Sequence, residues 1–242
     1  MDLQNKLVNI PELKILFEDN HILVVEKPVN IPTQADKTGD PDLLSIIQSL
    51  IRNRDQKEGK VYIGLIHRLD RPVGGLVVFA KTPKAASILA EQLRSKTIRK
   101  AYLTTVYGCP NETEAELRHF LFKIEKLNFS KVVKPIHTGG KEAVLNYKLI
   151  QTSPENYSLL KVELHTGRHH QIRVQLSAIG NPIFGDQKYG KNKSNSGQQL
   201  ALWAYHLSFQ HPIHKTEMAF ISMPPEIFPW KLFDKIRSNK IE

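Results

Sequence analysis

The 242-residue chain is poor in cysteine and in long apolar segments, and each shortage excludes a class of protein. Its single cysteine, Cys109, excludes an internal disulfide framework and a zinc site built from several thiolates. No apolar run approaches the ~20 residues that a membrane-spanning helix needs, and the first residues, MDLQNK, lack the layout of a signal peptide. We therefore expect a cytoplasmic protein without a membrane partner, in which Cys109 is a packing residue.

Acidic residues are also scarce compared with basic ones. The chain has 24 Asp and Glu against 34 Lys and Arg, a formal net charge of +10. Such an excess favours a polyanionic partner, because cations on a protein release the counterions condensed on nucleic acid. Charge alone leaves RNA, DNA and an anionic membrane open.

The hydrophobic pattern predicts many short strands and few helices, which is typical of an α+β sheet protein. A hairpin is expected over 14–27, and helices are expected over 42–52, after Thr82-Pro83, and in the segment that Gly180 ends. Asp40-Pro41 has the composition of a helix N-cap and first turn. Further strands are expected over 76–81, 101–107, 117–124, 132–136, 141–151, 157–165 and 200–209.

The most unusual stretch is HRLDRPVGGLVVFAKT, residues 67–82, in which one acid lies among cations. Asp70 is flanked by His67, Arg68 and Arg71, and nearby positive charge favours the ionised carboxylate. The proline and two glycines that follow predict a tight turn. These residues alone fit a catalytic loop and a charged surface turn equally well.

A second unusual stretch is GRHHQIRVQLSAIG, residues 167–180. Arg168 and Arg173 lie five positions apart, about 140° around a helix, so we expect them to have different partners. One can pair with Asp70 while the other faces a phosphate.

Three histidines in this region, His165, His169 and His170, suggest a metal site by their spacing. Gly167 interrupts any helix between the first two, no acid or cysteine lies close by, and the two arginines would repel a dication. We expect no metal here, and we expect histidines that are hydrogen-bonded or face RNA.

Taken together, the chain resembles the RluA-type family of RNA pseudouridine synthases. The resemblance rests on the 67–82 stretch, on RKAYLTTVYG, and on TGRHHQIRVQLSAIGNPIFGDQKYG, in this order and spacing. The segments DNHILVVEKP and LALWAYHLSFQHP also match, so the similarity spans about residues 14–212. It implies a mixed, mostly antiparallel sheet divided by a basic cleft, with flanking helices.

The resemblance also implies roles for individual residues. Asp70 is the nucleophile that attacks the uridine, Tyr102 stacks on the base and moves a proton, and Arg173 is the ion-pair partner of Asp70. Arg68 fills the gap left by the flipped nucleotide, and Leu202 forms an apolar wall. His67 and Arg168 are further candidates for RNA binding. The family needs no metal or organic cofactor.

The chain departs from the family pattern at several positions. After the aspartate, Val73-Gly74-Gly75 stands where Thr-Ser-Gly is usual. His169 replaces a small hydroxyl residue, and Asn181 and Trp203 replace common histidines. None of these removes a catalytic group, so they bear on the RNA target rather than on the reaction. We expect a single catalytic domain over 1–242, without a separate N-terminal RNA-binding domain, acting as a monomer on ribosomal or transfer RNA.

Two other functions have to be weighed. A non-catalytic RNA-binding or ribosome-assembly protein would use the same scaffold, but it would not need Asp70, Tyr102 and Arg173 together. A glycoside hydrolase needs a second carboxyl group at a defined separation. The acid that comes nearest to this requirement is Asp186 in FGDQKYG, which is followed by a lysine.

Overall fold

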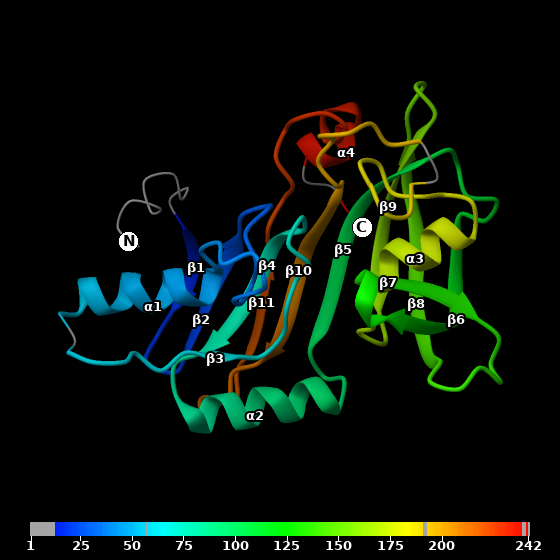
Figure 1. The fold of residues 1–242 in the computed structure, drawn as a ribbon. Coiled ribbons are helices and arrows are strands. Elements are labelled where there is room, and N and C mark those ends of the chain that lie inside the picture. The colour runs from blue at the N-terminus through cyan, green and yellow to red at the C-terminus, as the bar shows by residue number, and fades with distance from the viewer. Residues whose placement is uncertain (1–12, 57, 191–192, 239–240, 242) are drawn as a thin grey trace. The chain divides into compact units, whose positions relative to one another are not determined.

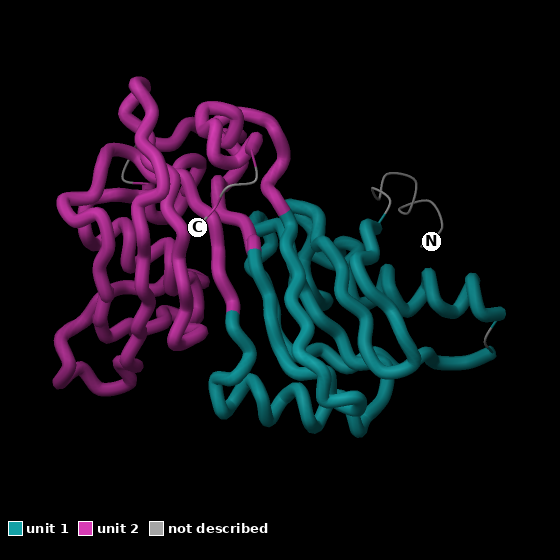
Figure 2. The backbone as a smooth tube through the Cα atoms, turned by 180° about the vertical axis from the view of Figure 1, so that it is seen from behind, with its two compact units in different colours: residues 1–99, 206–222 teal, residues 100–205, 223–242 magenta. Residues whose placement is uncertain are grey.

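The structure, a computed structural model, describes residues 13–56, 58–190, 193–238 and 241. The chain divides into two compact units (Figure 2). Unit 1 comprises residues 1–99 and 206–222, and unit 2 comprises residues 100–205 and 223–242. None of the helices in the described ranges is long and apolar enough to cross a membrane. The expectation of one catalytic domain stays a prediction.

Unit 1 contains a small antiparallel sheet with two helices (Figure 1). Strand β2 pairs with β1 on one side and with β4 on the other, β3 also pairs with β4, and β11 pairs with β10. Its elements are β1 (Lys14–Glu18), β2 (Ile22–Lys27), α1 (Leu43–Arg54), β3 (Gly64–Leu65), β4 (Gly74–Ala80), α2 (Pro83–Arg94), β11 (Glu217–Ile221) and the second half of β10 (Leu202–Gln210).

The core of unit 1 forms because β2, β4 and α2 place apolar side chains at the periodicities of a strand and a helix. All seven residues of β4 are buried. The buried cluster comprises Ile22, Val24, Leu76, Val78, Ala80, Ala85, Leu89, Ile98, Leu207 and Phe209. Strand β4 therefore holds the turn that precedes it in a fixed position, and this turn contains Asp70.

The strands of unit 2 pair antiparallel in the order β5-β9-β8-β6-β7. Its elements are β5 (Arg99–Tyr107), β6 (Glu114–Ile124), η2 (Glu125–Leu127), β7 (Phe129–Val133), β8 (Lys141–Thr152), β9 (Tyr157–Leu164), α3 (Gln171–Ala178), η3 (Trp230–Leu232) and α4 (Asp234–Arg237). The predicted α+β class with a mostly antiparallel sheet is confirmed.

Three local expectations were wrong. Helix α1 is capped by Asp42, whose Oδ1 accepts from the Ser45 amide at 3.1 Å, because Asp40 instead binds Arg71. Strand β7 ends at Val133 rather than residue 136, since two successive turns occupy residues 134–140. Cys109 is exposed because it follows a glycine with positive φ that ends β5.

Candidate active site

Asp70 lies in a tight turn whose backbone is fixed on both sides. The Val73 amide donates to the Asp70 carbonyl at 3.0 Å. The Thr33 hydroxyl donates to the Leu69 carbonyl at 2.8 Å and accepts from the Leu69 amide at 3.2 Å. Leu69 and Val73 are buried, whereas Asp70 is half-buried. The turn therefore holds a carboxylate at a defined place while leaving it partly accessible.

The two arginines beside Asp70 have different surroundings. Arg71 binds the loop 30–40, where its Nη2 donates to Asp40 Oδ2 at 2.6 Å and its Nε donates to the Asn30 carbonyl at 3.0 Å. Arg68 is exposed and has no hydrogen bond or ion pair to any described residue. Arg68 is therefore available to a ligand, whereas Arg71 has a structural partner.

His67 is buried, and its Nε2 accepts a hydrogen bond from the Val78 amide at 3.2 Å. A ring nitrogen that accepts a hydrogen bond has no proton. The bond therefore selects the neutral ring, and Arg68 and Arg71 are the permanent cations of this turn. The substrate-binding roles of His67 and Arg68 stay predictions.

Lys27, at the end of β2, is a residue of this site that sequence reasoning missed. Its side chain is fully buried, and Nζ donates to the carbonyls of Pro28, Ile31 and Arg71 at 3.0, 2.6 and 3.1 Å. Burial lowers the pKa of Lys27 to about 7, while the negative charge of Asp70 raises this pKa and Arg71 lowers it. Asp70 therefore has a buried basic group within electrostatic range in its own unit.

We expect Lys27→Met to remove a pH dependence of stability. In the unfolded chain lysine titrates near 10.5, so between about pH 7 and 10.5 the unfolded state binds more protons than the folded state. Stability of the wild type therefore rises with pH in this window, by on the order of 1 kcal/mol per pH unit from this group. Urea unfolding of both proteins between pH 7 and 9.5 measures the difference.

The control is Lys60→Met, which replaces an exposed lysine of the same unit. Its stability should follow the wild-type pH profile. If Lys27→Met also ran parallel to the wild type, the buried ammonium could not be titrating in this range.

In unit 2, Arg173 on α3 forms a bidentate ion pair with Asp186. Its Nε donates to Asp186 Oδ2 and its Nη2 donates to Oδ1, both at 2.8 Å. Both residues are buried, and Asp186 Oδ1 also accepts from the amides of Lys188 and Tyr189 at 2.9 and 3.0 Å. A paired, hydrogen-bonded buried charge has a fixed orientation. Asp186 therefore orients Arg173 rather than serving as a second catalytic carboxylate.

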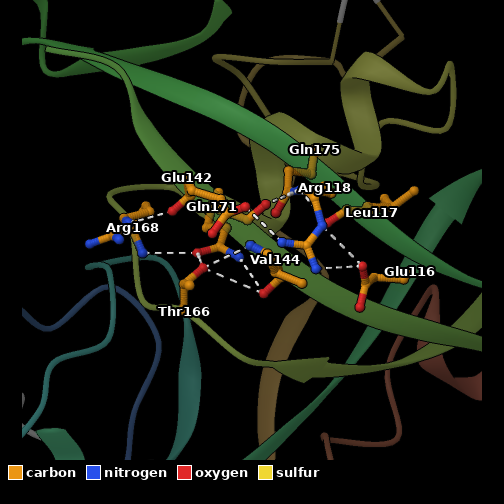
Figure 3. Close-up of polar contacts among 10 residues, drawn as sticks. Glu116, Leu117, Arg118, Glu142, Val144, Thr166, Arg168, Gln171 and Gln175 are labelled. Atoms are coloured by element: carbon orange, nitrogen blue, oxygen red, sulfur yellow. Dashed lines mark hydrogen bonds and ion pairs between the residues drawn. The ribbon is translucent and has the colours of Figure 1, made fainter. Parts of the chain in front are cut away.

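Two glutamines anchor helix α3 to the sheet of unit 2 (Figure 3). Gln171 Nε2 donates to the Val144 carbonyl of β8 at 3.1 Å, and Gln175 Nε2 donates to the Leu117 carbonyl of β6 at 2.9 Å. These bonds fix the rotation of the helix and hence the direction in which Arg173 leaves it.

Arg168 is exposed, and its Nε donates to the Glu142 carbonyl at 2.8 Å (Figure 3). Arg168 and Arg173 therefore have different partners, as expected, but Arg168 precedes α3, so their angle around a helix is not the reason. The role of Arg168 in RNA binding stays a prediction.

Tyr102 on β5 and Leu202 on β10 are both buried in unit 2. Tyr102 lies opposite Val162 of β9 in the register of the sheet. Asp70 belongs to unit 1, whereas Tyr102, Arg173 and Leu202 belong to unit 2. That Asp70 acts at one site with Tyr102, Arg173 and Leu202 stays a prediction.

The described residues contain one cluster with the composition of a metal site, Asp19, His211 and His214. His211 Nε2 lies 2.9 Å from Asp19 Oδ2, and His211 Nδ1 accepts from the amides of Ile213 and His214 at 3.2 and 2.9 Å. Because Nδ1 is an acceptor, the proton of the neutral ring is on Nε2 and is donated to Asp19. A metal at Nε2 would displace this proton, so the cluster fits a structural link between two turns.

The comparison with known proteins decides the family. Residues 21–178 match the family model described as RNA pseudouridylate synthase, a range that contains Asp70, Tyr102 and Arg173. The chain belongs to this family. The RNA pseudouridine synthase YhcT of Bacillus subtilis, described as uncharacterized, is 35% identical over 84% of this chain and 65% of its own length.

Other members of the family support the RluA-type resemblance. The dual-specificity RNA pseudouridine synthase RluA of Escherichia coli O157:H7 is 31% identical over 87% of this chain and 92% of its own length. The ribosomal large subunit pseudouridine synthase D of Zymomonas mobilis is 34% identical over 92% of this chain and 72% of its own length. The structure of human RNA pseudouridylate synthase domain containing 4 has the same fold, with a TM-score of 0.76 at 22% identity over 93% of each chain.

Proposed function

We propose that the protein isomerises selected uridines of ribosomal or transfer RNA to pseudouridine, with Asp70 as the nucleophile. The observation that carries this proposal is the half-buried carboxylate on a fixed turn, inside the segment that matches the pseudouridylate synthase family. The curated relatives have names that refer to RNA and, for one of them, to the large ribosomal subunit. We also propose that the protein works as a monomer in the cytoplasm.

The reaction needs groups of the kind that these residues supply. Moving uracil from a nitrogen linkage to a carbon linkage breaks the glycosidic bond, after which the base is held, rotated and rejoined. Asp70 attacks the nucleotide as an ionised carboxylate, and Arg173 stabilises that charge. Tyr102 grips the base by stacking and moves a proton. No atom is gained or lost overall, and no cofactor takes part.

The uridine has to leave its helical stack before it can react, because a paired base is out of reach. Arg68 is proposed to fill the gap that the flipped nucleotide leaves, which agrees with its exposed side chain. Leu202 is proposed as an apolar wall for the base. His67 and Arg168 are proposed to support the RNA-contacting segments on the two units.

An exposed basic segment on unit 2 also supports RNA as the partner. Three acids around strands β6 to β8 are bound by basic residues, since Arg118 contacts Glu116 and Glu142 and Lys123 contacts Glu125. The exposed lysines without an acidic partner among the described residues of this segment are Lys126, Lys131, Lys134, Lys141 and Lys148. Such a surface binds phosphates through counterion release.

The proposal can be tested with RNA from cells that lack the gene. Total RNA is incubated with the purified protein, and pseudouridine is mapped by carbodiimide-stop primer extension. We expect new stops at one or a few uridines of ribosomal or transfer RNA, at sites that are modified in the parent strain. If the protein binds this RNA but creates no stop, it is the non-catalytic RNA-binding protein instead.

A further inference from the structure

Tyr189 in unit 2 contacts Arg173 by its ring. The Arg173 Cζ atom lies 5.1 Å from the centroid of the Tyr189 ring, which stacks on Phe129 with centroids 4.7 Å apart. A guanidinium over an aromatic face is attracted by the ring quadrupole, and more strongly when both groups are desolvated. Arg173 and Tyr189 are both 5% exposed, so this condition is met.

The Tyr189 hydroxyl is fixed by two hydrogen bonds. It accepts from the Ser130 amide at 2.9 Å and contacts His170 Nδ1 at 2.8 Å. Burial first, and the charge of Arg173 second, lower the pKa of His170 to about 2, so the imidazole stays neutral. The hydroxyl accepts from Ser130, and its hydrogen bond with Nδ1 forms in either direction according to the tautomer of the neutral ring. The ring is therefore held at both its face and its edge.

The backbone of Tyr189 is fixed as well. Its amide donates to Asp186 Oδ1 at 3.0 Å, and its carbonyl accepts from the Ser177 hydroxyl of α3 at 2.8 Å. Tyr189 thus connects three segments: strand β7, helix α3 and the Asp186 turn. Only Arg173 among its neighbours is assigned to the reaction.

We infer that Tyr189 is a positioning residue for the reaction, because its ring limits where the Arg173 guanidinium can lie. Asp186 binds Nε and Nη2 of Arg173 along one edge of the guanidinium, and the Tyr189 ring lies against its face, with Cζ 5.1 Å from the ring centroid. The two contacts together aim the remaining N–H groups in one direction. This inference rests on the proposed function.

The test separates the ring from the hydroxyl. Tyr189→Phe keeps the ring and removes the two hydrogen bonds, so we expect a lower melting temperature but a kcat within about 3-fold of the wild type. Tyr189→Met keeps apolar volume and removes the ring, so we expect kcat to fall by about 10- to 30-fold. RNA affinity should change by less than about 3-fold in both, because Tyr189 is buried away from RNA.

A background variant shows whether Tyr189 acts through Arg173. In Arg173→Lys the ring no longer has a guanidinium to position, so adding Tyr189→Met should reduce the remaining rate by less than about 3-fold. Phe129→Leu is the control, since Phe129 stacks on the Tyr189 ring and is not assigned to the reaction. It should lower stability and leave kcat unchanged.

Three results would overturn the inference while wild-type activity persists. The first is a wild-type kcat in folded Tyr189→Met. The second is an equal loss of kcat in Tyr189→Phe and Tyr189→Met. The third is that Tyr189→Met lowers kcat in the Arg173→Lys background by the same factor as in the wild type. An inactive wild type would instead refute the proposed function. If Tyr189→Met does not fold, Tyr189→Leu replaces it, because leucine also keeps apolar volume and removes the ring, and a wild-type kcat in folded Tyr189→Leu would contradict a positioning role.

Discussion

Asp70→Asn should lower the single-turnover rate of pseudouridine formation by about 10⁴-fold or more, the scale on which loss of a catalytic nucleophile acts. The carboxamide is nearly the same size as the carboxylate but has no negative charge and is a very poor nucleophile. RNA affinity should change by less than about 3-fold, because binding is dominated by phosphate contacts. The turn should persist, since its bonds come from the backbone and Thr33.

The measurement uses excess enzyme over RNA, with filter binding on the same samples. Glu58→Gln is the matched control, an amide substitution of an exposed acid in the same unit. It should react at the wild-type rate. A wild-type rate in Asp70→Asn would exclude Asp70 as the nucleophile, whatever the family of the chain.

Arg173→Lys should lower the rate by about 10²- to 10³-fold, the usual effect of removing one preorganised donor to a charged centre. A lysine keeps the positive charge, but it cannot bind Asp186 with two parallel N–H groups and also face a second carboxylate. Lysine is preferred to alanine, because alanine would leave the buried Asp186 carboxylate without a partner at a cost of about 3–5 kcal/mol.

The same single-turnover assay measures this variant, and thermal unfolding checks its fold. Arg168→Lys is the control, because Arg168 is exposed and lies five residues away on the same segment. We expect it to change the apparent affinity for RNA rather than the rate at saturation. An Arg173→Lys enzyme with unchanged turnover would show that the guanidinium has no part in the reaction.

Much of the fold could be predicted because its periodicities are strong. The buried run of β4 and the Thr82-Pro83 start of α2 have local signals that packing does not override. Asp40-Pro41 has a similar local signal, but the helix start predicted from it was wrong. The long-range bond from Arg71 to Asp40 competes with capping, and the next acid, Asp42, caps the helix instead. Local propensity fails where a distant side chain needs the same oxygen atoms.

The site could be predicted only where a motif marks it. Asp70 and Arg173 lie in unusual local sequences, so the sequence alone proposes them as site residues. Lys27, Asp186 and Tyr189 were missed as site residues, because each acts through contacts with segments far away in the chain. For Lys27 the sequence has one usable signal, a lysine that ends a strand beginning with four apolar residues and directly precedes a proline. Asp186 lies in a turn bounded by glycines.

The central proposal is the one that the family resemblance implies: Asp70 is the nucleophile, and Arg173 is the partner that stabilises its charge. A double-mutant cycle of Asp70→Asn and Arg173→Lys on the free energy of unfolding tests it most directly, because effects on Lys27 and Asp186 cancel between the two sides of the cycle. We predict a coupling energy of about 1 kcal/mol or more, as for residues in contact. Effects that add to within about 0.5 kcal/mol, as for distant residues, would contradict this partnership.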